Sequence, residues 1–461
     1  MAADSFRITL AQFNPVAGDV AGNAAKVREA RSKAAADGAD LLVLPELFLA
    51  GAPPQQSVLD AAFLLACRTA IEALARETAD GGPAVLIGTP WVEDGKLYNA
   101  VALLDGGRVA ATRFKINLPD DQKRLFLRGP AAGPVSVRGV RIGIAIGEDI
   151  WPEGAGDENV VETLAETGAE LVVVSAAACY VRGGGDRRLS AAVARVTESD
   201  LPLIWLNQTG GQVGQVFDGA SFALNADLSV AAQRPAFVDD VSTLAWSRGA
   251  DGWQGQGPVA KLIEGDEADY AARVLGLRDH VGKSGLNGVV LGLTASLETV
   301  LSLAIAVDAL GPAKVRGVVL AGPDTAVPAQ DAAIAAAARL GVAAEVVPIA
   351  AAVAGFETIL PGQLGSGPHR ELLARVRATL LDALASLSGA LAFASAQAST
   401  PHGDEVGPGF TLLGDISPPQ LSRLAALRNR WQPADALGPG GEVIAPDLVA
   451  PAATDARDDR G

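Results

Sequence analysis

Histidine and cysteine are scarce in this 461-residue chain, which contains three of the first and two of the second. His280, His369 and His402 lie far apart in the sequence, so we predict no metal site. Cys67 and Cys179 are too few for a disulfide framework or a zinc site, and we expect both to be small, buried apolar residues. This cysteine usage predicts a cytoplasmic location.

Basic residues and long apolar runs are also in short supply. The chain has 37 Lys and Arg against 53 Asp and Glu, which gives a net charge of −16. Phosphate contacts need clustered Lys and Arg, so nucleic acid is not expected as a partner. No uninterrupted apolar run reaches the roughly 20 residues of a membrane span, so no membrane partner is expected either. Residues 1–7 lead directly into a strand-like run, with no evident signal peptide.

The length and the pattern of apolar residues predict at least two folded parts. At about 150 residues per domain, the chain has room for two or three domains, and a hydrophobic fraction of 49% supports large cores. Alternation of strands and helices in the second half is typical of a mostly parallel sheet. We expect strands at 7–12, 40–44, 84–89, 99–104, 288–293, 315–320, 343–348 and 390–394. We expect helices at 23–36, 267–283, 300–310, 329–340 and 370–386.

Two stretches depart from these regular patterns. Residues 237–266 are loosely patterned and rich in glycine, which predicts a linker. The last residues are rich in Pro, Gly, Ala and Asp, which predicts a disordered tail. The expected parts are therefore a first domain at 1–236, a linker at 237–266, a second domain at 267–432 and a tail at 433–461.

The stretch 141–151 has the pattern of a buried strand that ends abruptly in an acidic turn at Gly147. A strand-to-turn elbow of this kind can hold a nucleophile up into a pocket. Gly147 has no side chain, however, and can perform no covalent step. Glu46 follows the strand predicted at 40–44, where a carboxylate is costly to bury unless it is hydrogen-bonded or functional. Taken alone, Glu46 also fits a helix-capping or loop carboxylate.

A polar turn at 294–299 separates a predicted strand from a long apolar helix. Strand, polar turn and helix is the layout of a nucleotide phosphate site, because backbone N–H groups at a helix N-terminus attract anions. An ordinary turn capped by Thr294 or Thr299 has the same layout. The layout alone leaves both interpretations open.

Several motifs of the first half recur in the order of one known family. They are residues 8–15, 17–19, 45–48, 115–119, 206–208, 210–212 and 216–221. With these motifs the chain resembles, over residues 5–235, the nitrilase superfamily and more narrowly the glutaminase domain of glutamine-dependent NAD synthetases. The resemblance implies an αββα sandwich and hydrolysis of the glutamine amide by a Glu-Lys-Cys triad.

By this resemblance Glu46 is the general base, Lys115 stabilises the oxyanion, and Gly147 stands where the family has its cysteine nucleophile. The tyrosine of a family turn is Ala52, and a second family glutamate corresponds to Gln122. Loss of a thiolate leaves at best the residual effect of the oxyanion donors, so we expect no glutaminase activity. The alternative is attack by water with Glu46 as base.

Residues 276–279, 288–293 and 304–311 resemble the ATP-pyrophosphatase domain of the same family, and this second resemblance covers residues 267–432. It implies a Rossmann-like, doubly wound parallel sheet. It also implies a Ser-Gly-Gly-x-Asp-Ser loop that binds the phosphates of ATP and helps to hold magnesium. The corresponding loop of this chain is 294–299.

Every informative position of that loop differs from the family. Thr294 and Thr299 keep hydroxyl groups, and Glu298 keeps a charge on a longer side chain. Ala295 and Ser296 replace two glycines and lose their freedom for positive φ and close approach to a ligand. Magnesium tolerates little deviation from octahedral geometry, so Glu298 can misplace it. The resemblance thus implies ATP and magnesium as cofactors, and we expect these changes to weaken their binding.

Two later features also differ from the family. Residues 395–401 stand where the family has a substrate-facing loop, and its Asn, Lys and Glu are missing there. Residues 409–415 keep a remnant of the next family motif. Family members usually continue with more helical sequence, so we expect a C-terminally shortened member.

Three hypotheses about function follow from the resemblance, whose implied reaction is ATP-dependent amidation of nicotinic acid adenine dinucleotide. The first is a pseudoenzyme that acts as a structural, regulatory or ligand-sensing subunit, because key groups are missing from both sites. The second is a residual, ammonia-dependent NAD synthetase. The third is a binding module for another nucleotide or amide metabolite. We expect the chain to associate with itself, as a homodimer or larger assembly, or with an active homologue.

Overall fold

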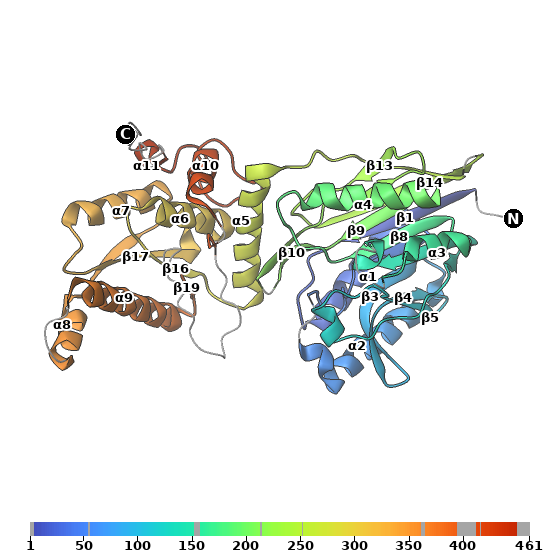
Figure 1. The fold of residues 1–461 in the computed structure, drawn as a ribbon, viewed down its shortest axis with the longest axis horizontal. Helices are drawn as coiled ribbons and strands as arrows, with labels where there is room; N and C mark the ends of the chain where they lie inside the picture. Colours follow the sequence, from blue (N-terminus) through green and yellow to red (C-terminus); the bar gives the residue numbers. More distant parts are fainter. Residues whose placement is uncertain are drawn as a thin grey trace, which may run out of the picture. The chain divides into compact units, whose positions relative to one another are not determined.

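The computed structural model describes residues 4–53, 56–151, 157–212, 214–250, 252–360, 365–393, 412–414 and 416–449. The chain divides into two compact units, Met1–Ile263 and Glu264–Gly461. Both units combine helices with strands (Figure 1), so the predicted α/β class is confirmed.

The first unit is built on two facing sheets with the strand orders β15-β14-β1-β2-β3-β4-β5 and β13-β12-β9-β8-β7-β6. The first sheet comprises β1 (Ser5–Gln12), β2 (Leu41–Val43), β3 (Ala84–Glu93), β4 (Lys96–Asp105), β5 (Arg108–Phe114), β14 (Asp240–Gly249) and β15 (Gly252–Gln256). The second comprises β6 (Val135–Val137), β7 (Val140–Ile146), β8 (Leu171–Ala176), β9 (Leu203–Asn207), β12 (Phe222–Leu224) and β13 (Val230–Gln233). The facing sides of both sheets share one apolar core, which includes Leu10, Val43 and Ile144.

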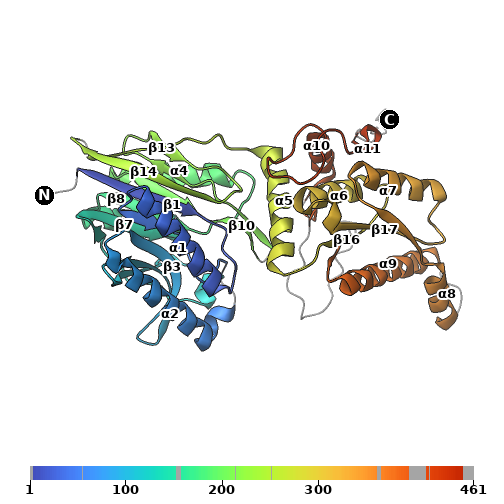
Figure 2. The same ribbon diagram turned by 180° about the vertical axis from the view of Figure 1, so that it is seen from behind.

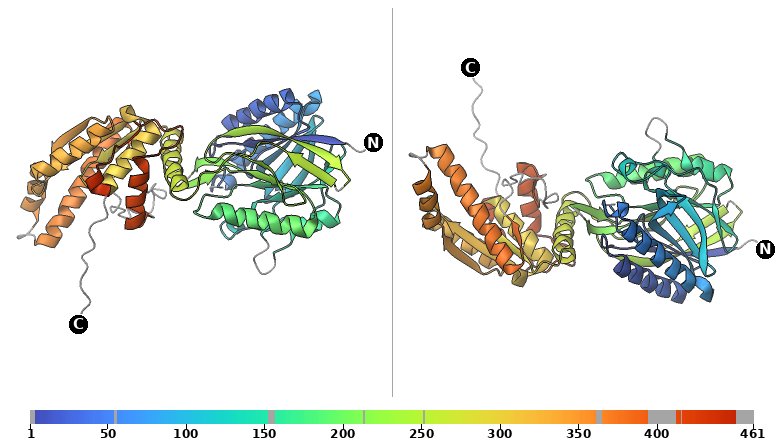
Figure 3. Two further views of the ribbon diagram at one scale, coloured as in Figure 1. Left: turned by 90° about the horizontal axis from the view of Figure 1, so that it is seen from above. Right: turned by 90° about the horizontal axis from the view of Figure 1, so that it is seen from below.

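Helices cover the outer face of each sheet in the first unit. Helices α1 (Val20–Ala36) and α2 (Ala61–Glu77) pack on the first sheet through Val27 and Ile71. Helices α3 (Val160–Glu166) and α4 (Gly184–Ser199) pack on the second sheet through Val161 and Val196. Figure 3 shows the resulting layers, with the blue helices on one side of the sheets and green α4 on the other. The predicted αββα sandwich is therefore confirmed.

The linker predicted at 237–266 is wrong in its central part, which forms β14 and β15. Strand β14 pairs antiparallel with β1 along its length, and β15 pairs with β14. Trp246 and Trp253, which lie in these strands, are only 1% and 3% exposed and belong to the core between the sheets. Glycine is needed there for packing, because a Cβ on Gly255 would lie 2.7 Å from the Trp246 ring. The glycine content therefore reflects close packing in a strand.

The variant Gly255→Ala is expected to lower the free energy of unfolding of the first unit by about 1–3 kcal/mol, because the added methyl group overpacks the Trp246 ring. Urea unfolding followed by tryptophan fluorescence measures the change. The matched control is Gly249→Ala in the same pair of strands, where the nearest atom to an added Cβ is 3.7 Å away. That control should change stability by less than about 0.5 kcal/mol. Equal losses in both variants would contradict the packing explanation.

The second unit has a four-stranded sheet with the order β18-β17-β16-β19, in which every neighbouring pair is parallel. Its strands are β16 (Val289–Gly292), β17 (Val315–Ala321), β18 (Ala344–Pro348) and β19 (Leu391–Phe393). Its helices are α5 (Gly265–Lys283), α6 (Leu297–Leu310), α7 (Val327–Arg339), α8 (Ala350–Ile359), α9 (Ser366–Ser388), α10 (Pro418–Arg428) and α11 (Pro446–Val449). The strands and helices predicted between 267 and 394 all occur, with bounds that differ by a few residues.

Helices flank both faces of this sheet. Leu291 and Val319 face a core shared with α5, α6, α7 and α10. Val290 and Val318 face a core shared with α8 and α9. Figures 1 and 2 show α6 and α7 on one side of the sheet and α8 and α9 on the other. The strand order reverses between β16 and β19, which makes the carboxyl end of β16 the switch point where doubly wound sheets bind ligands.

The prediction of a disordered tail from residue 433 is wrong for residues 433–449. Val443 and Ile444 are 3% and 0% exposed and belong to the core of the second unit. Asn429 holds the segment in place, since its Oδ1 accepts hydrogen bonds from the backbone N–H groups of both residues, at 3.0 and 2.9 Å. Residues 450–461 and the predicted loop at 395–401 lie outside the described residues, as does most of the motif at 409–415.

A buried ion pair also fastens this C-terminal segment to α6. The Arg428 guanidinium donates to both carboxylate oxygens of Asp308, at 2.6 and 2.8 Å. Tyr270 donates a further hydrogen bond of 2.7 Å to the same carboxylate. Both charged side chains are 0% exposed. Burial, together with the charge of Asp308, raises the pKa of Tyr270 well above its usual value.

Candidate functional site

The strand ends of the two sheets in the first unit surround a cavity of about 470 Å³. Glu46 follows β2, Lys115 follows β5 directly, and Gly147 follows β7. The structure therefore brings together three positions that the sequence separates by up to about 100 residues. The described lining residues are Glu46, Leu47, Ala52, Pro53, Asn117, Leu118, Pro119, Asp121, Gln122, Glu148, Trp151, Asp157, Ala177, Ala178, Cys179, Val181, Gly184, Arg187, Arg188 and Gln215.

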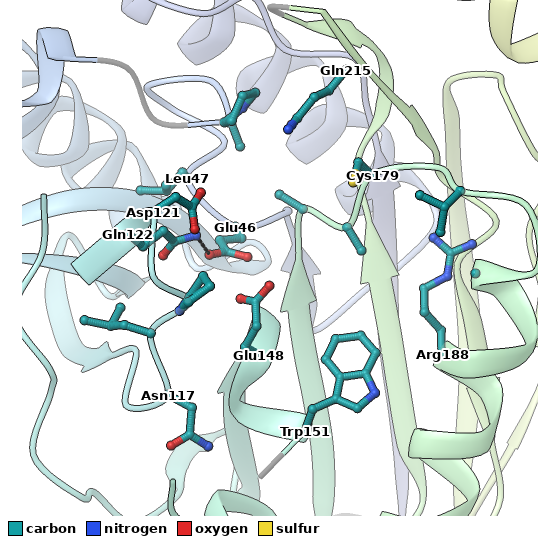
Figure 4. A pocket seen from close by; sticks show the side chains of 18 of the residues that line it. Glu46, Leu47, Asn117, Asp121, Gln122, Glu148, Trp151, Cys179, Arg188 and Gln215 are labelled. Carbon is teal, nitrogen blue, oxygen red and sulfur yellow. Dashed lines mark hydrogen bonds between the residues drawn. The ribbon is translucent and has the colours of Figure 1, made fainter. Parts of the chain in front are cut away.

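Glu46 lies at the centre of a buried hydrogen-bond network and is 2% exposed. Its Oε1 accepts from Lys115 Nζ at 2.6 Å, from Asn99 Nδ2 at 2.6 Å and from Gln122 Nε2 at 3.3 Å. Asn99 Nδ2 also donates to Gln122 Oε1 at 3.0 Å. A carboxylate that only capped a helix or lay in a loop would not be the centre of such a buried network in the pocket. Figure 4 shows the side chains of Glu46, Gln122 and Glu148 directed into the same space.

Lys115 is completely buried and pairs with two carboxylates, those of Glu46 and Glu148. Burial alone would lower the pKa of Lys115, but the two negative charges raise it well above its usual value. The two carboxylates therefore favour the charged form of Lys115. Burial raises the pKa of Glu148, against the opposing effect of Lys115.

The loop that carries Lys115 is joined to the elbow after β7 by Asp149. Its carboxylate accepts hydrogen bonds from the backbone N–H groups of Ile116, Asn117 and Ile146, at 3.0, 2.8 and 3.0 Å. Burial raises the pKa of Asp149 to about 7, although these donors favour its charged form. Asp149 thus fixes the distance between the lysine loop and the elbow.

Gly147 begins the short 3₁₀ turn Gly147–Ile150 and has a φ of +50°, in the left-handed region. A Cβ built there would lie 2.5 Å from Glu46 Oε2 and 2.8 Å from Lys115 Nζ. A side chain at this position would therefore enter the space between the carboxylate and the ammonium. The pocket holds a carboxylate and an ammonium around a position that has no side chain.

The two cysteines have different environments, and the prediction that both are buried is wrong for Cys179. Cys67 is 0% exposed, as predicted, and belongs to the core beneath α2. Cys179 is exposed and lines the pocket. Partial burial raises the pKa of the Cys179 thiol, so the less reactive protonated form dominates near neutral pH.

Sequence reasoning missed Asn99, Asp149 and the exposure of Cys179. Asn99 lies inside β4, where the sequence does not distinguish it from any other polar residue of a strand. It reaches Glu46 only because β4 pairs with β3, which itself pairs with β2. Asp149 belongs to the acidic turn after Gly147. Its position close to Gly147 was the one signal in the sequence that could have identified it as a residue of the site.

In the second unit, the turn at 294–299 forms a closed cluster of hydroxyl groups. Thr294 Oγ1 lies 2.8 Å from Thr299 Oγ1 and 3.1 Å from Ser296 Oγ, and Ser296 Oγ lies 3.1 Å from Thr299 Oγ1. Ser296 caps α6, because its side chain accepts from the Thr299 N–H at 3.3 Å. The cap is therefore Ser296, and neither Thr294 nor Thr299, which were the residues named in the alternative of an ordinary capped turn. Glu298 lies in the first turn of α6.

A second cavity, of about 510 Å³, opens beside this turn at the carboxyl ends of β16 and β17. Of the predicted loop residues, Thr294 and Ala295 line it. Among the residues that the structure describes, no three His, Cys, Asp or Glu side chains gather where they could hold a metal ion. The hydroxyl groups at 294–299 are directed at one another.

The first unit is an αββα sandwich with a buried Glu–Lys pair, and the second is built on a doubly wound parallel sheet. Together they define a class of proteins in which a carbon–nitrogen hydrolase domain is joined to an α/β domain of the nucleotide-binding type. The family model described as "Carbon-nitrogen hydrolase" matches residues 7–250, and the model described as "NAD synthase" matches residues 269–431. The chain belongs to the glutamine-dependent NAD(+) synthetase family.

Individual relatives support this assignment. The glutamine-dependent NAD(+) synthetase of Rhodobacter capsulatus is 39% identical, with 96% of this chain and 82% of the relative covered. The Xanthomonas campestris relative is 33% identical, with 99% and 84% covered. The structure of the Acinetobacter baumannii enzyme in complex with ADP superposes with a TM-score of 0.86 at 29% identity, covering 97% of this chain and 85% of that one. No helix in the described part of the chain combines the length and apolar character that a membrane crossing requires.

Proposed function

We propose that this chain is a noncatalytic member of the glutamine-dependent NAD(+) synthetase family that serves as a structural, regulatory or ligand-sensing subunit. The position of Gly147 carries the proposal. It lies within reach of both a buried base and a buried cation, at the position where the family resemblance implies an attacking cysteine. The changed loop of the second unit supports the same conclusion, because two separate sites lack groups that their chemistry needs.

The partner and the ligand are part of this proposal. We expect self-association, as a homodimer or larger assembly, or association with an active NAD synthetase homologue. Light scattering of the purified chain distinguishes a monomer from an assembly. If the chain is a monomer and also fails to bind an active relative, it cannot serve as a structural subunit. The proposal would then be reduced to a ligand-sensing role.

The purified chain is expected to release ammonia from glutamine at least about a thousandfold more slowly than the Rhodobacter capsulatus relative, because loss of a nucleophile removes most of the rate enhancement. A coupled ammonia assay measures the rate, with both proteins at the same concentration. Water attack with Glu46 as base would instead give a measurable rate that Glu46→Gln abolishes. Such a rate would overturn the proposal for the first site.

The second candidate function is an ammonia-dependent NAD synthetase. Its support is the relative from Acinetobacter baumannii, solved with ADP, together with the hydroxyl groups retained at Thr294 and Thr299. Formation of NAD from nicotinic acid adenine dinucleotide, ATP, magnesium and ammonium tests it directly. We expect no product above the protein-free blank, because the loop hydroxyl groups are engaged with one another.

A further inference from the structure

One carboxylate oxygen in the cavity of the first unit has no hydrogen-bond partner among the described residues. The three side-chain donors around Glu46 all bind its Oε1; they are Lys115 Nζ, Asn99 Nδ2 and Gln122 Nε2. None of these bonds involves Oε2. A side chain at position 147 would begin 2.5 Å from Oε2, so Gly147 leaves this oxygen uncovered. Glu46 is 2% exposed and lines the cavity. Because buried polar atoms are normally hydrogen-bonded, Oε2 calls for a donor from within the cavity.

The buried charges beside this oxygen do not balance. Lys115 provides one positive charge for two carboxylates, those of Glu46 and Glu148. Because both carboxylates contact the same nitrogen, they lie close enough to share one further small cation, and two attractions outweigh the repulsion from Lys115 at similar distances. Burial raises the pKa of Glu148 in spite of the Lys115 charge, as expected where positive charge is in short supply. A ligand with one positive charge would make the group neutral.

The rest of the described lining supplies no positive charge that could take the place of such a ligand. The Arg188 guanidinium is bound by Asp218 in a buried ion pair, with one N–H···O distance of 2.7 Å. Arg187 is exposed, and two further carboxylates, Asp121 and Asp157, line the same cavity. Carboxylates therefore outnumber cations around the cavity, which disfavours an anionic ligand.

The remaining surface of the cavity fits a short apolar chain. Leu47, Leu118 and Trp151 line it, together with alanine and proline side chains. Figure 4 shows Leu47 and Trp151 on opposite sides of the two carboxylates. A volume of about 470 Å³ is typical of small-molecule pockets, which combine apolar surface with a few placed polar groups. In the described part of the chain, no three His, Cys, Asp or Glu side chains gather around a possible metal position, which favours an organic cation.

We propose that the cavity of the first unit binds a primary ammonium group on a short apolar chain, with the ammonium donating to Glu46 Oε2 and to Glu148. An ammonium has three donors and a compact charge, which suits two neighbouring carboxylates. A carboxamide offers donors without charge and would leave the buried group negative. The inference rests on the proposed function and deepens it, because it names the class of ligand for a noncatalytic, ligand-sensing chain.

Calorimetric titration of the full chain with n-butylammonium, butyramide and butyrate, at constant ionic strength, tests the proposal. These probes share a short chain and differ in charge. We expect butylammonium to bind at least about tenfold more tightly than butyramide, because its hydrogen bonds to the carboxylates are charge-assisted at both ends. Butyrate should not bind. Equal or tighter binding of butyramide would overturn the inference, as would absence of butylammonium binding at millimolar concentration. Ammonia release from glutamine, measured separately, would instead overturn the proposed function.

A matched pair of charge variants locates the binding. Glu148→Gln keeps the shape of the side chain and removes one negative charge from the buried group, so it should weaken butylammonium binding at least about tenfold. Glu166→Gln removes the same charge from an exposed position on α3, outside the cavity lining. It should change the affinity less than about twofold, because solvent and salt screen that charge. Equal weakening in both variants would mean that the overall charge of the chain attracts the amine, and the inference would fail.

Covering the Glu46 oxygen gives an independent test. Gly147→Ala places a methyl group against Oε2 and should weaken butylammonium binding at least about tenfold, because the oxygen loses its access to a donor. Gly139→Ala is the control for backbone strain. Gly139 precedes β7 and has a φ of +83°, and an added Cβ there meets no atom within 4 Å. The control should bind butylammonium as the native chain does. Unchanged binding in Gly147→Ala would place the amine elsewhere and overturn the inference.

Discussion

The variant Gly147→Cys is expected to release ammonia from glutamine at least about a hundredfold faster than the native chain, because it supplies the missing nucleophile. Glu46 and Lys115 are already in place. They approach the position of the new Cβ with terminal atoms, at 2.5 and 2.8 Å, which can turn aside without a backbone shift. The Lys115 ammonium favours the thiolate, which is the reactive form. The positive φ costs about 1–2 kcal/mol, so the variant should still fold.

Two measurements make this prediction specific. The experiments use a Cys179→Ser background, because Cys179 lines the same pocket and would react with iodoacetamide. Mass spectrometry should then find one alkylated thiol at position 147 in the pocket. Adding Glu46→Gln should return ammonia release to the native level. A thiol that is alkylated but releases no ammonia would show that the pocket has also lost the ability to position glutamine, contrary to the prediction.

The variant Asp308→Ala is expected to destabilise the second unit by about 3–5 kcal/mol, because it leaves the buried Arg428 charge without a partner. Both side chains are 0% exposed, so water cannot replace the lost carboxylate. Tyr270 loses its acceptor at the same time. Hydrogen exchange measured by mass spectrometry should show faster exchange in α5, α6 and α10, while peptides of the first unit keep their protection.

An exposed ion pair of the same unit provides the control. Arg316 and Glu345 join β17 to β18 with side chains that are 42% and 46% exposed. Replacing Glu345 with alanine should cost no more than about 1 kcal/mol, because water solvates both groups in its absence. If Asp308→Ala also cost no more than about 1 kcal/mol of stability, the C-terminal segment would be held by its apolar contacts alone.

The order of motifs predicted much of the fold and the three positions of the first site. Glu46, Lys115 and Gly147 each follow a strand, and parallel strands such as β7 and β8 end on the same edge of their sheet. The family resemblance carried by these motifs placed the three residues in one site, whereas local pattern alone left Glu46 open as a helix-capping or loop carboxylate. Neither the motifs nor the local pattern could predict that Lys115 is shared by two carboxylates, which depends on side-chain packing across the sandwich.

Both errors in the predicted boundaries have one physical cause, which is that long-range contacts outweighed local composition. Residues 240–256 are glycine-rich, yet the pairing of β14 with β1 makes them part of a sheet. Residues 433–449 are poor in regular structure, yet Asn429 and Arg428 fix them through side-chain hydrogen bonds. Composition averages over a window and contains no information about such partners.

The ion pair of the second unit has a consequence for protein synthesis. Asp308 and Arg428 are 120 residues apart in the chain, so α6 leaves the ribosome long before its charged partner is made. At roughly 5–20 residues per second, this interval is about 6–24 s. During that time α6 carries a carboxylate destined for an apolar interior, together with the unpaired apolar surface around it. We therefore expect the second unit of the nascent chain to depend most on chaperones in the interval before Arg428 is added.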